Sequence, residues 1–148
     1  TSGLLYKPDK LVADVLNDDV EGLIICGGWF GVIREELIEL IRKLDSQNKL
    51  LAGICGAGTF FLASAGVLDK VSYTTPVTNW TKKHIEIFGS KDPFPRENYI
   101  EKRVVVDKNV ITALGTAFID FAVEICSWLQ LFESEEEKEC FIQLYTGL

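Results

Sequence analysis

The chain of 148 residues carries 15 basic and 22 acidic side chains, which gives a formal net charge of −7 at pH 7. At this length we expect one domain, residues 1–148. The basic residues are scattered, so we expect no nucleic-acid partner. No apolar stretch is long enough to span a bilayer, so we expect no membrane partner. The start does not resemble a signal peptide, and we therefore expect a cytoplasmic protein.

The first eighteen residues hold turn formers and short apolar pieces, but no run that is typical of a buried strand. The chain starts at Thr1 and contains no methionine. A parallel sheet built only from the later residues would be small. We therefore expect an N-terminally incomplete domain, in which a strand–helix–strand segment precedes Thr1.

Two buried strands joined by a helix are predicted next. Residues 20–26 and residues 50–54 are apolar runs, and residues 35–44 between them place apolar side chains at helical spacing. Such a βαβ unit has parallel strands and a right-handed crossover. Glu35 and Glu36 are carboxylates at the start of this helix, where their negative charge favours the helix N-terminus.

The second half of the chain predicts a short β segment, a brief helix, a β-hairpin and two further helices, the last with a capping-box pattern. With the βαβ unit, these elements predict an α/β fold of three layers around a mostly parallel sheet. In chain order they are residues 71–75, residues 80–88, residues 104–106 with 110–112, residues 116–132 and the segment that Ser134 and Glu137 begin.

Cys55 stands at the carboxyl end of the second strand, directly before Gly56. A buried strand, a nucleophilic residue with small neighbours and then a helix form the pattern of a nucleophile elbow, a turn so sharp that only small side chains fit beside the reactive one. The thiol then faces a helix N-terminus, which favours the thiolate. The alternative is a buried cysteine that acts as a small apolar residue.

Two glycine-rich strand ends, Gly27-Gly28 and Cys55-Gly56, lie where open α/β sheets bind ligands. If the strands are neighbours, the N–H groups of Gly28 and Gly56 converge beside the Cys55 sulfur as an oxyanion hole. Alternatively, both glycine pairs only permit tight turns. Trp29 follows the first pair and is a candidate for the pocket wall, with plain packing as the alternative.

The other cysteines, Cys26, Cys126 and Cys140, show no metal-ligand spacing with Cys55, and His84 is the only histidine. We therefore predict no metal site and no cofactor. Three of the four cysteines lie in apolar segments, which suits a reducing compartment. His84 has charged neighbours and is predicted to be a surface residue of a helix rather than a base.

Four motifs together resemble the ThiJ/PfpI family of the class I glutamine amidotransferase-like superfamily, and the final helices resemble its bacterial branch. The last motif runs from a strand through Thr-Ala-x-Gly-Thr into a helix that contains Phe-Ala. The resemblance implies a flavodoxin-like sandwich, usually a homodimer, with an elbow cysteine assisted by a histidine and by a carboxylate from the loop after the first strand. The motifs are Ile24–Gly28, Ala52–Ala57, Ala63–Asp69 and Val110–Ala122.

Carried over to this chain, the resemblance makes Cys55 the nucleophile and the amides of Gly28 and Gly56 the oxyanion donors. The family's histidine stands in the short strand after a Gly-Val-Leu-Asp turn, next to a threonine. Here that stretch reads VSYTTP and holds no histidine. Tyr73, Thr74 and Thr75 take its place and are candidates for the pocket, while the carboxylate loop would precede the first residue.

Two classes of function follow. The first is a cysteine-dependent hydrolase or amidotransferase-like enzyme for a small acyl or carbonyl substrate, which is slow because the family histidine is absent. The alternative is a protein without turnover in which Cys55 senses oxidants in a stress response or binds a ligand. A third possibility is that the elbow persists only as scaffold. The expected partners are a small-molecule substrate or oxidant and a second copy of the chain.

Overall fold

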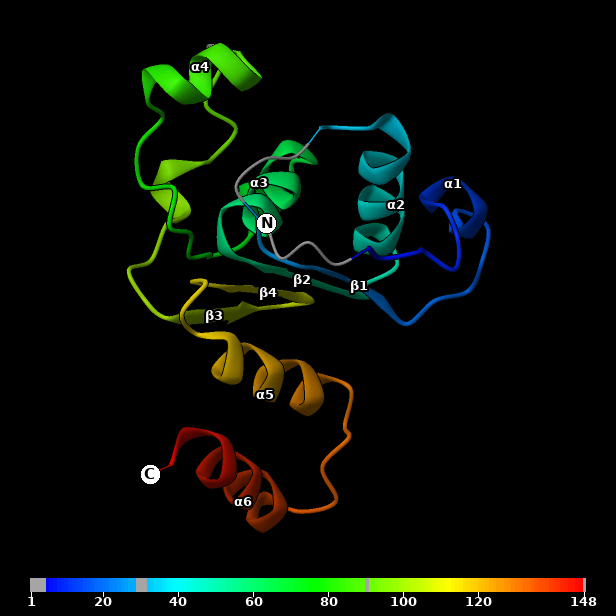
Figure 1. The fold of residues 1–148 in the computed structure, drawn as a ribbon, viewed down its shortest axis with the longest axis vertical. Helices are drawn as coiled ribbons and strands as arrows, with labels where there is room; N and C mark the ends of the chain where they lie inside the picture. Colours follow the sequence, from blue (N-terminus) through cyan, green and yellow to red (C-terminus); the bar gives the residue numbers. More distant parts are fainter. Residues whose placement is uncertain (1–4, 29–31, 90, 148) are drawn as a thin grey trace.

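A four-stranded, mostly parallel sheet forms the centre of the molecule (Figure 1). The structure is a computed structural model, and it describes residues 5–28, 32–89 and 91–147. The strand order is β1-β2-β4-β3, in which β1, β2 and β4 are parallel and β3 forms an antiparallel hairpin with β4. The strands are β1 Gly22–Ile25, β2 Leu50–Ile54, β3 Val104–Asp107 and β4 Val110–Ala113.

Helices cover both faces of this sheet, which confirms the predicted three-layer α/β fold. Helices α2 (Glu35–Ser46) and α3 (Cys55–Ser64) pack on one face, and α5 (Phe118–Trp128) packs on the other (Figure 1). The predicted βαβ unit is therefore present as β1, α2 and β2. Its helix lies on the same side of the sheet as α3 (Figure 1).

Strand β2 is buried on both faces. Leu51 belongs to the apolar cluster beneath α2 and α3, whereas Leu50 and Ala52 belong to the cluster beneath α5. Neighbouring side chains of a strand point to opposite faces, so a strand between two cores needs a continuous apolar run. Burial therefore explains the sequence of β2, and it places the carboxyl end of this strand between those of β1 and β4.

The short β segment predicted for residues 71–75 is wrong as a regular strand. Only Tyr73 forms a β-bridge, to Tyr99. The backbone amide of Thr74 donates instead to the side-chain hydroxyl of Thr112, at 2.9 Å. A side chain that takes a backbone amide in this way competes with a regular ladder. The segment nevertheless lies against β4, and this contact brings it to the carboxyl edge of the sheet.

The C-terminal helix α6 (Glu135–Thr146) packs on α5 and forms an outer tier (Figure 1). The hydroxyl of Ser134 accepts the N–H of Glu137 at 3.1 Å, as the capping-box pattern predicts. No helix in the described part of the chain is long and apolar enough to cross a membrane. The remaining helices are short: α1 Val12–Val15, α4 Lys82–Phe88 and two 3₁₀ turns, η1 Val67–Lys70 and η2 Arg96–Asn98.

Candidate functional site

Cys55 is the first residue of α3 and follows β2 without any intervening loop. The preceding residue, Ile54, is extended, with φ −112° and ψ 143°. Cys55 itself has a φ of 63°, in the left-handed region that residues with a Cβ rarely adopt. A non-glycine residue held there costs about 1 kcal/mol or more, and such strain is concentrated at functional sites. The chain therefore turns from strand to helix at the thiol itself.

Two glycines leave room for the side chain of Cys55. A Cβ atom added at Gly27 would lie 2.7 Å from the Cβ of Cys55, and one added at Gly115 would lie 3.1 Å from its Sγ. Gly27 follows β1 and Gly115 follows β4, so the ends of three neighbouring strands meet around the thiol. Gly115 is missed by sequence reasoning, although its place just beyond β4 is where such sheets build their sites.

The glycine-rich ends of β1 and β2 converge, because the two strands are paired. The N–H of Ala57 donates to the carbonyl of Gly28 at 3.2 Å. Gly28 and Gly56 line the same cavity as Cys55, whose side chain is partly buried. The N–H groups in the first turn of a helix have no intrahelical partner, and the helix dipole there favours negative charge. Gly56 is the second residue of α3 and carries such an N–H.

A chain of buried hydroxyl groups reaches the backbone of Cys55 from the interior. The Thr59 hydroxyl donates to the Cys55 carbonyl at 2.8 Å and lies 2.7 Å from the hydroxyl of Thr75. The N–H of Val77 in turn donates to the Thr75 hydroxyl at 3.2 Å. Thr59 and Thr75 are both fully buried. We call this series from Val77 through the two threonines to Cys55 the hydroxyl chain.

A cavity of about 340 Å³ opens on one side of Cys55, and much of its wall is aromatic. Phe60 comes from α3, and its ring centroid lies 4.4 Å from that of Phe88 and 6.0 Å from that of Trp80. None of the described residues that line it is Asp, Glu, Lys or Arg. We call it the aromatic cavity.

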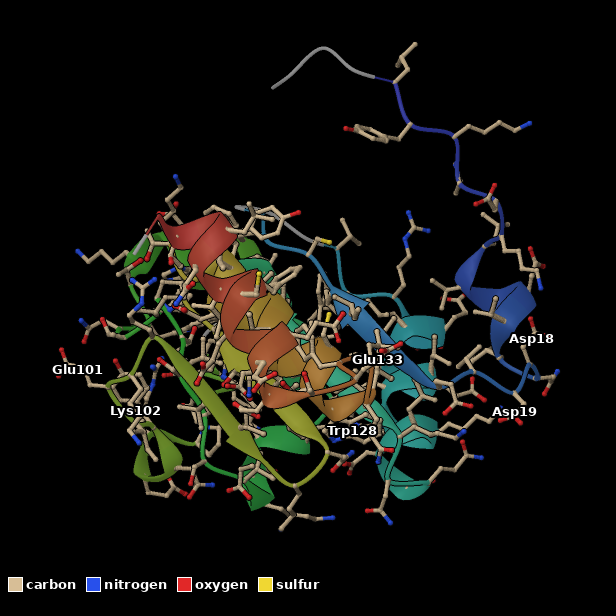
Figure 2. All side chains as sticks on the ribbon, turned by 90° about the horizontal axis from the view of Figure 1, so that it is seen from below. Asp18, Asp19, Glu101, Lys102, Trp128 and Glu133 are labelled. Atoms are coloured by element: carbon tan, nitrogen blue, oxygen red, sulfur yellow. The ribbon has the colours of Figure 1, made fainter. Side chains whose placement is uncertain are left out.

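A wider cleft of about 580 Å³ opens on the other side of the thiol. Its wall includes Glu101, Lys102 and Arg103 from the segment that leads into β3, together with Thr75 and Gly115. Glu101 and Lys102 lie at the periphery of the molecule, far from Asp18 and Asp19 at the opposite end (Figure 2). The cleft combines both signs of charge, and we call it the charged cleft.

His84 lines the aromatic cavity, but one ring nitrogen is already used within α4. Its Nδ1 accepts the backbone N–H of Thr81 at 3.1 Å, and its ring stacks on Trp80 with centroids 4.9 Å apart. A neutral imidazole that accepts at Nδ1 carries its proton at Nε2. Sequence reasoning places His84 on a surface helix and misses the cavity wall. Trp80 lies just before α4, and the four-residue spacing from Trp80 to His84 and from His84 to Phe88 is the signal in the sequence that these rings gather on one side.

Tyr73 and Thr74 are fully buried and line neither hollow beside Cys55, which corrects the expectation that they belong to the pocket. The Tyr73 ring packs on Phe94, its hydroxyl has no hydrogen-bond partner within the described residues, and burial raises the pKa of Tyr73 to about 12. Thr75 reaches the charged cleft. Trp29 lies outside the described residues. Within the part of the chain that the structure describes, no three His, Cys, Asp or Glu side chains gather as a metal ion requires.

Three comparisons relate the chain to known proteins. The sequence profile of the DJ-1/PfpI family matches residues 1–127. The chain is 35% identical over 128 residues to Protein DJ-1 homolog A of Arabidopsis thaliana, which covers 78% of this chain and 29% of that protein. It is 31% identical over 126 residues to the uncharacterized protease YdeA of Bacillus subtilis, which covers 83% of this chain and 60% of that protein.

The fold is also similar to that of oxidized Toxoplasma gondii DJ-1, with a TM-score of 0.73 at 22% sequence identity. This superposition covers 97% of the present chain and 73% of the Toxoplasma chain. At such low identity the likeness concerns the fold alone. The chain spans three fifths or less of the length of the Arabidopsis and Bacillus relatives, as the shares of 29% and 60% state.

Proposed function

The chain belongs to the DJ-1/PfpI family, and we propose that it performs thiol chemistry at Cys55 on a small carbonyl or acyl compound. The observation that carries the proposal is the position of Cys55 at a φ of 63° on the first residue of α3, partly buried and open to a hollow on each side. Strain, a helix N-terminus and access are the features that activate a cysteine nucleophile. The Bacillus relative is named as an uncharacterized protease, which is in keeping with acyl chemistry.

In the proposed reaction the Cys55 thiolate adds to the carbonyl carbon. A carbon–sulfur bond forms, and the electron pair of the carbonyl double bond moves to the oxygen. The N–H groups of Gly28 and Gly56 would hold this oxyanion. With an acyl substrate, collapse of the adduct breaks the bond to the leaving group, which takes a proton from solvent. The resulting thioester is then hydrolysed by water.

We expect this reaction to be slow. Thr75 stands in the stretch where the family places its histidine, and its hydroxyl is already engaged with that of Thr59. The Nδ1 of His84 is likewise engaged, with the N–H of Thr81. General acid–base assistance contributes about 10²–10⁴-fold to such rates, so a site without it should react once or turn over slowly.

The aromatic cavity supports a neutral substrate that carries an apolar group. Phe60, Trp80 and Phe88 present ring surfaces, and no lining residue within the described part of the chain has a charged carboxylate, ammonium or guanidinium group. Burial of a charged ligand group there would be costly without a partner. An apolar group, by contrast, would gain from contact with the rings while its carbonyl lies at the thiol.

Oxidant sensing is the second candidate. A partly exposed thiolate without a general base reacts with peroxide as well as with carbonyl compounds, and it passes through sulfenic to sulfinic acid. The same amides that would hold an oxyanion would hold the sulfinate oxygens. Mild peroxide treatment followed by mass spectrometry tests this candidate. We expect the first oxidised cysteine to be Cys55, whereas oxidation that starts at Cys140 would contradict it.

We further propose that the protein forms a homodimer in the cytoplasm. Exposed apolar side chains on α6, such as Leu144 at 74% and Tyr145 at 57% exposure, are available for contact with another copy. Light scattering on the purified protein measures the assembly. A mass of one chain at micromolar concentration would contradict the dimer.

Alkylation of the four cysteines tests the main proposal. With iodoacetamide near neutral pH, we expect Cys55 to be labelled faster than Cys26, Cys126 and Cys140, and labelled positions are quantified by mass spectrometry. Hydrolysis of a generic ester should be slow and should disappear in the Cys55→Ala variant. Equal labelling of the four cysteines, or protection of Cys55, would show that it is no activated nucleophile.

A further inference from the structure

We propose that Thr75 and Thr59 are positioning residues that strengthen the backbone donor of the Cys55 site through the peptide bond between Cys55 and Gly56. The inference rests on the proposed function, because it concerns the same thiol. It assigns a role to two buried hydroxyl groups that the thiol chemistry itself does not touch.

The hydroxyl chain has only one possible direction. A carbonyl oxygen accepts and cannot donate, so the Thr59 hydroxyl, 2.8 Å from the Cys55 carbonyl oxygen, uses its single proton there. Thr59 must then accept at its other contact, which makes Thr75 the donor of the 2.7 Å bond between them. Thr75 in turn accepts from the N–H of Val77. Each donor therefore polarises the next one toward Cys55.

The inner end of the hydroxyl chain coincides with the proposed oxyanion donor. The carbonyl of Cys55 and the N–H of Gly56 belong to the same peptide group, so a hydrogen bond to that carbonyl strengthens the N–H as a donor. The Thr59 hydroxyl also lies 3.2 Å from the carbonyl oxygen of Gly56, which is a longer and secondary contact. Both threonines are fully buried, where such polarisation is screened least.

The outer end of the hydroxyl chain, at Val77, is held in place by an arginine. Nη1 of Arg96 donates to the carbonyl of Val77 at 2.6 Å, and Nε of the same side chain donates to Asp92 at 2.8 Å. Val77 is therefore fixed on both its N–H and its carbonyl. A donor fixed in this way keeps the hydroxyl of Thr75 turned toward Thr59.

The test compares two neighbouring threonines that are equally buried. Thr75→Val removes a hydroxyl from the chain without changing the shape of the side chain. Thr74→Val removes an equivalent hydroxyl, which donates to the carbonyl of Lys102 at 2.7 Å and does not lead to Cys55. The readout is the rate of iodoacetamide labelling at Cys55 relative to Cys140 within the same sample, measured as a function of pH.

We expect Thr75→Val to slow Cys55 labelling about two- to four-fold near neutral pH, because such a factor corresponds to the partial loss of one charge-assisted hydrogen bond. The curve of labelling rate against pH should also move to higher pH. Thr75→Ser should restore the wild-type curve, and Thr74→Val should leave it unchanged at a similar cost in thermal stability. Thr59→Ala removes the last donor of the chain and gives the same readout if Thr75→Val does not fold.

The outcomes separate this inference from the proposed function. If wild-type Cys55 is labelled no faster than Cys140, the proposed function fails, and the role of the hydroxyl chain fails with it. Wild-type Cys55 could instead be labelled faster than Cys140, while Thr75→Val and Thr74→Val slow its labelling equally or Thr75→Ser does not restore the labelling rate. In that case only the positioning role is overturned.

Discussion

Cys55 lies between two hollows that differ in chemistry because their walls come from different parts of the chain. The walls of the aromatic cavity are ring faces from α3 and from the region of α4, which pack on one another. The charged cleft is lined instead by the exposed loop that carries Glu101 to Arg103 into β3 and by the glycine turn after β4. One thiol is therefore open to a neutral apolar reagent on one side and to a polar one on the other. The choice of reagent can report which side it uses.

The largest effect should come from a change that displaces the thiol from both hollows. In Gly27→Ala the new Cβ would lie 2.7 Å from the Cβ of Cys55, so the elbow must shift. We expect a loss of about 1–3 kcal/mol in the free energy of unfolding, the usual cost of overpacking, and at least a ten-fold drop in Cys55 labelling. Urea unfolding and mass spectrometry measure the two effects.

Gly28→Ala is the matched control for this change. Among the described residues, its new Cβ would meet only the Cβ of Ala57, at 3.7 Å, which is an ordinary contact. The backbone N–H that is proposed as an oxyanion donor also stays in place. We expect labelling and stability close to wild type. Equal losses in Gly27→Ala and Gly28→Ala would show that the clash with Cys55 is not what matters at this strand end.

A smaller effect should distinguish the role of the aromatic cavity from that of the charged cleft. Trp80→Ala removes a ring from the aromatic cavity, and a ring contact is worth about 0.5–1.5 kcal/mol. We therefore expect labelling of Cys55 by the neutral aromatic reagent N-phenyl iodoacetamide to fall about five-fold. Labelling by the small anion iodoacetate, which gains nothing from the rings, should stay within two-fold.

Trp128→Ala is the control for the loss of a tryptophan. Trp128 packs in the cluster beneath α5, on the far face of the sheet, and lines neither hollow. It should change the rates of both reagents by the same small factor. If Trp80→Ala also slows both reagents equally, the aromatic cavity does not select the reagent, and the difference between the hollows has no chemical consequence.

The central elements and the sharp strand-to-helix turn at Cys55 are predictable from sequence because the physics that sets them is local. The continuous apolar run of β2 and the small residues around Cys55 identify a buried strand and a sharp turn directly. The segment 71–75 is mispredicted because its amide at Thr74 finds a partner on Thr112, a residue far away in sequence. The role of Trp80 depends in the same way on its contact with Phe60 of α3, which lies far away in sequence, and the spacing of Trp80, His84 and Phe88 does not show which element the rings meet.

Tyr73 supplies a prediction about the core beneath the site, away from both hollows. Its hydroxyl is buried without a partner within the described residues, and burial raises the pKa of Tyr73 to about 12. The unfolded chain loses this proton near its ordinary pKa of about 10, so the folded state holds it longer and stability falls as the pH rises from about 10 to 12. The loss should be of the order of 2 kcal/mol, measured by urea unfolding at each pH.

Tyr73→Phe should remove this alkaline loss while leaving Cys55 labelling unchanged. At neutral pH it should be neutral or stabilising by up to about 1 kcal/mol, because a buried hydroxyl without a partner is costly. Tyr99→Phe, on a neighbouring ring that is partly buried, serves as the control. A wild-type alkaline loss that persists in Tyr73→Phe would assign it to another group.

The smallest effect should come from His84, although it is the only histidine and lines the aromatic cavity. Its Nδ1 is occupied by the N–H of Thr81, so the ring caps the start of α4 and does not take a proton from the thiol. We expect His84→Ala to change Cys55 labelling less than two-fold, with about 0.5–1 kcal/mol lost in stability as for other helix caps. His84→Gln, which keeps an acceptor at this capping position, should recover the stability. A hundred-fold loss of Cys55 labelling in both variants, with a changed pH profile, would instead identify His84 as the missing base, and the aromatic cavity would then hold the catalytic proton acceptor as well as the substrate.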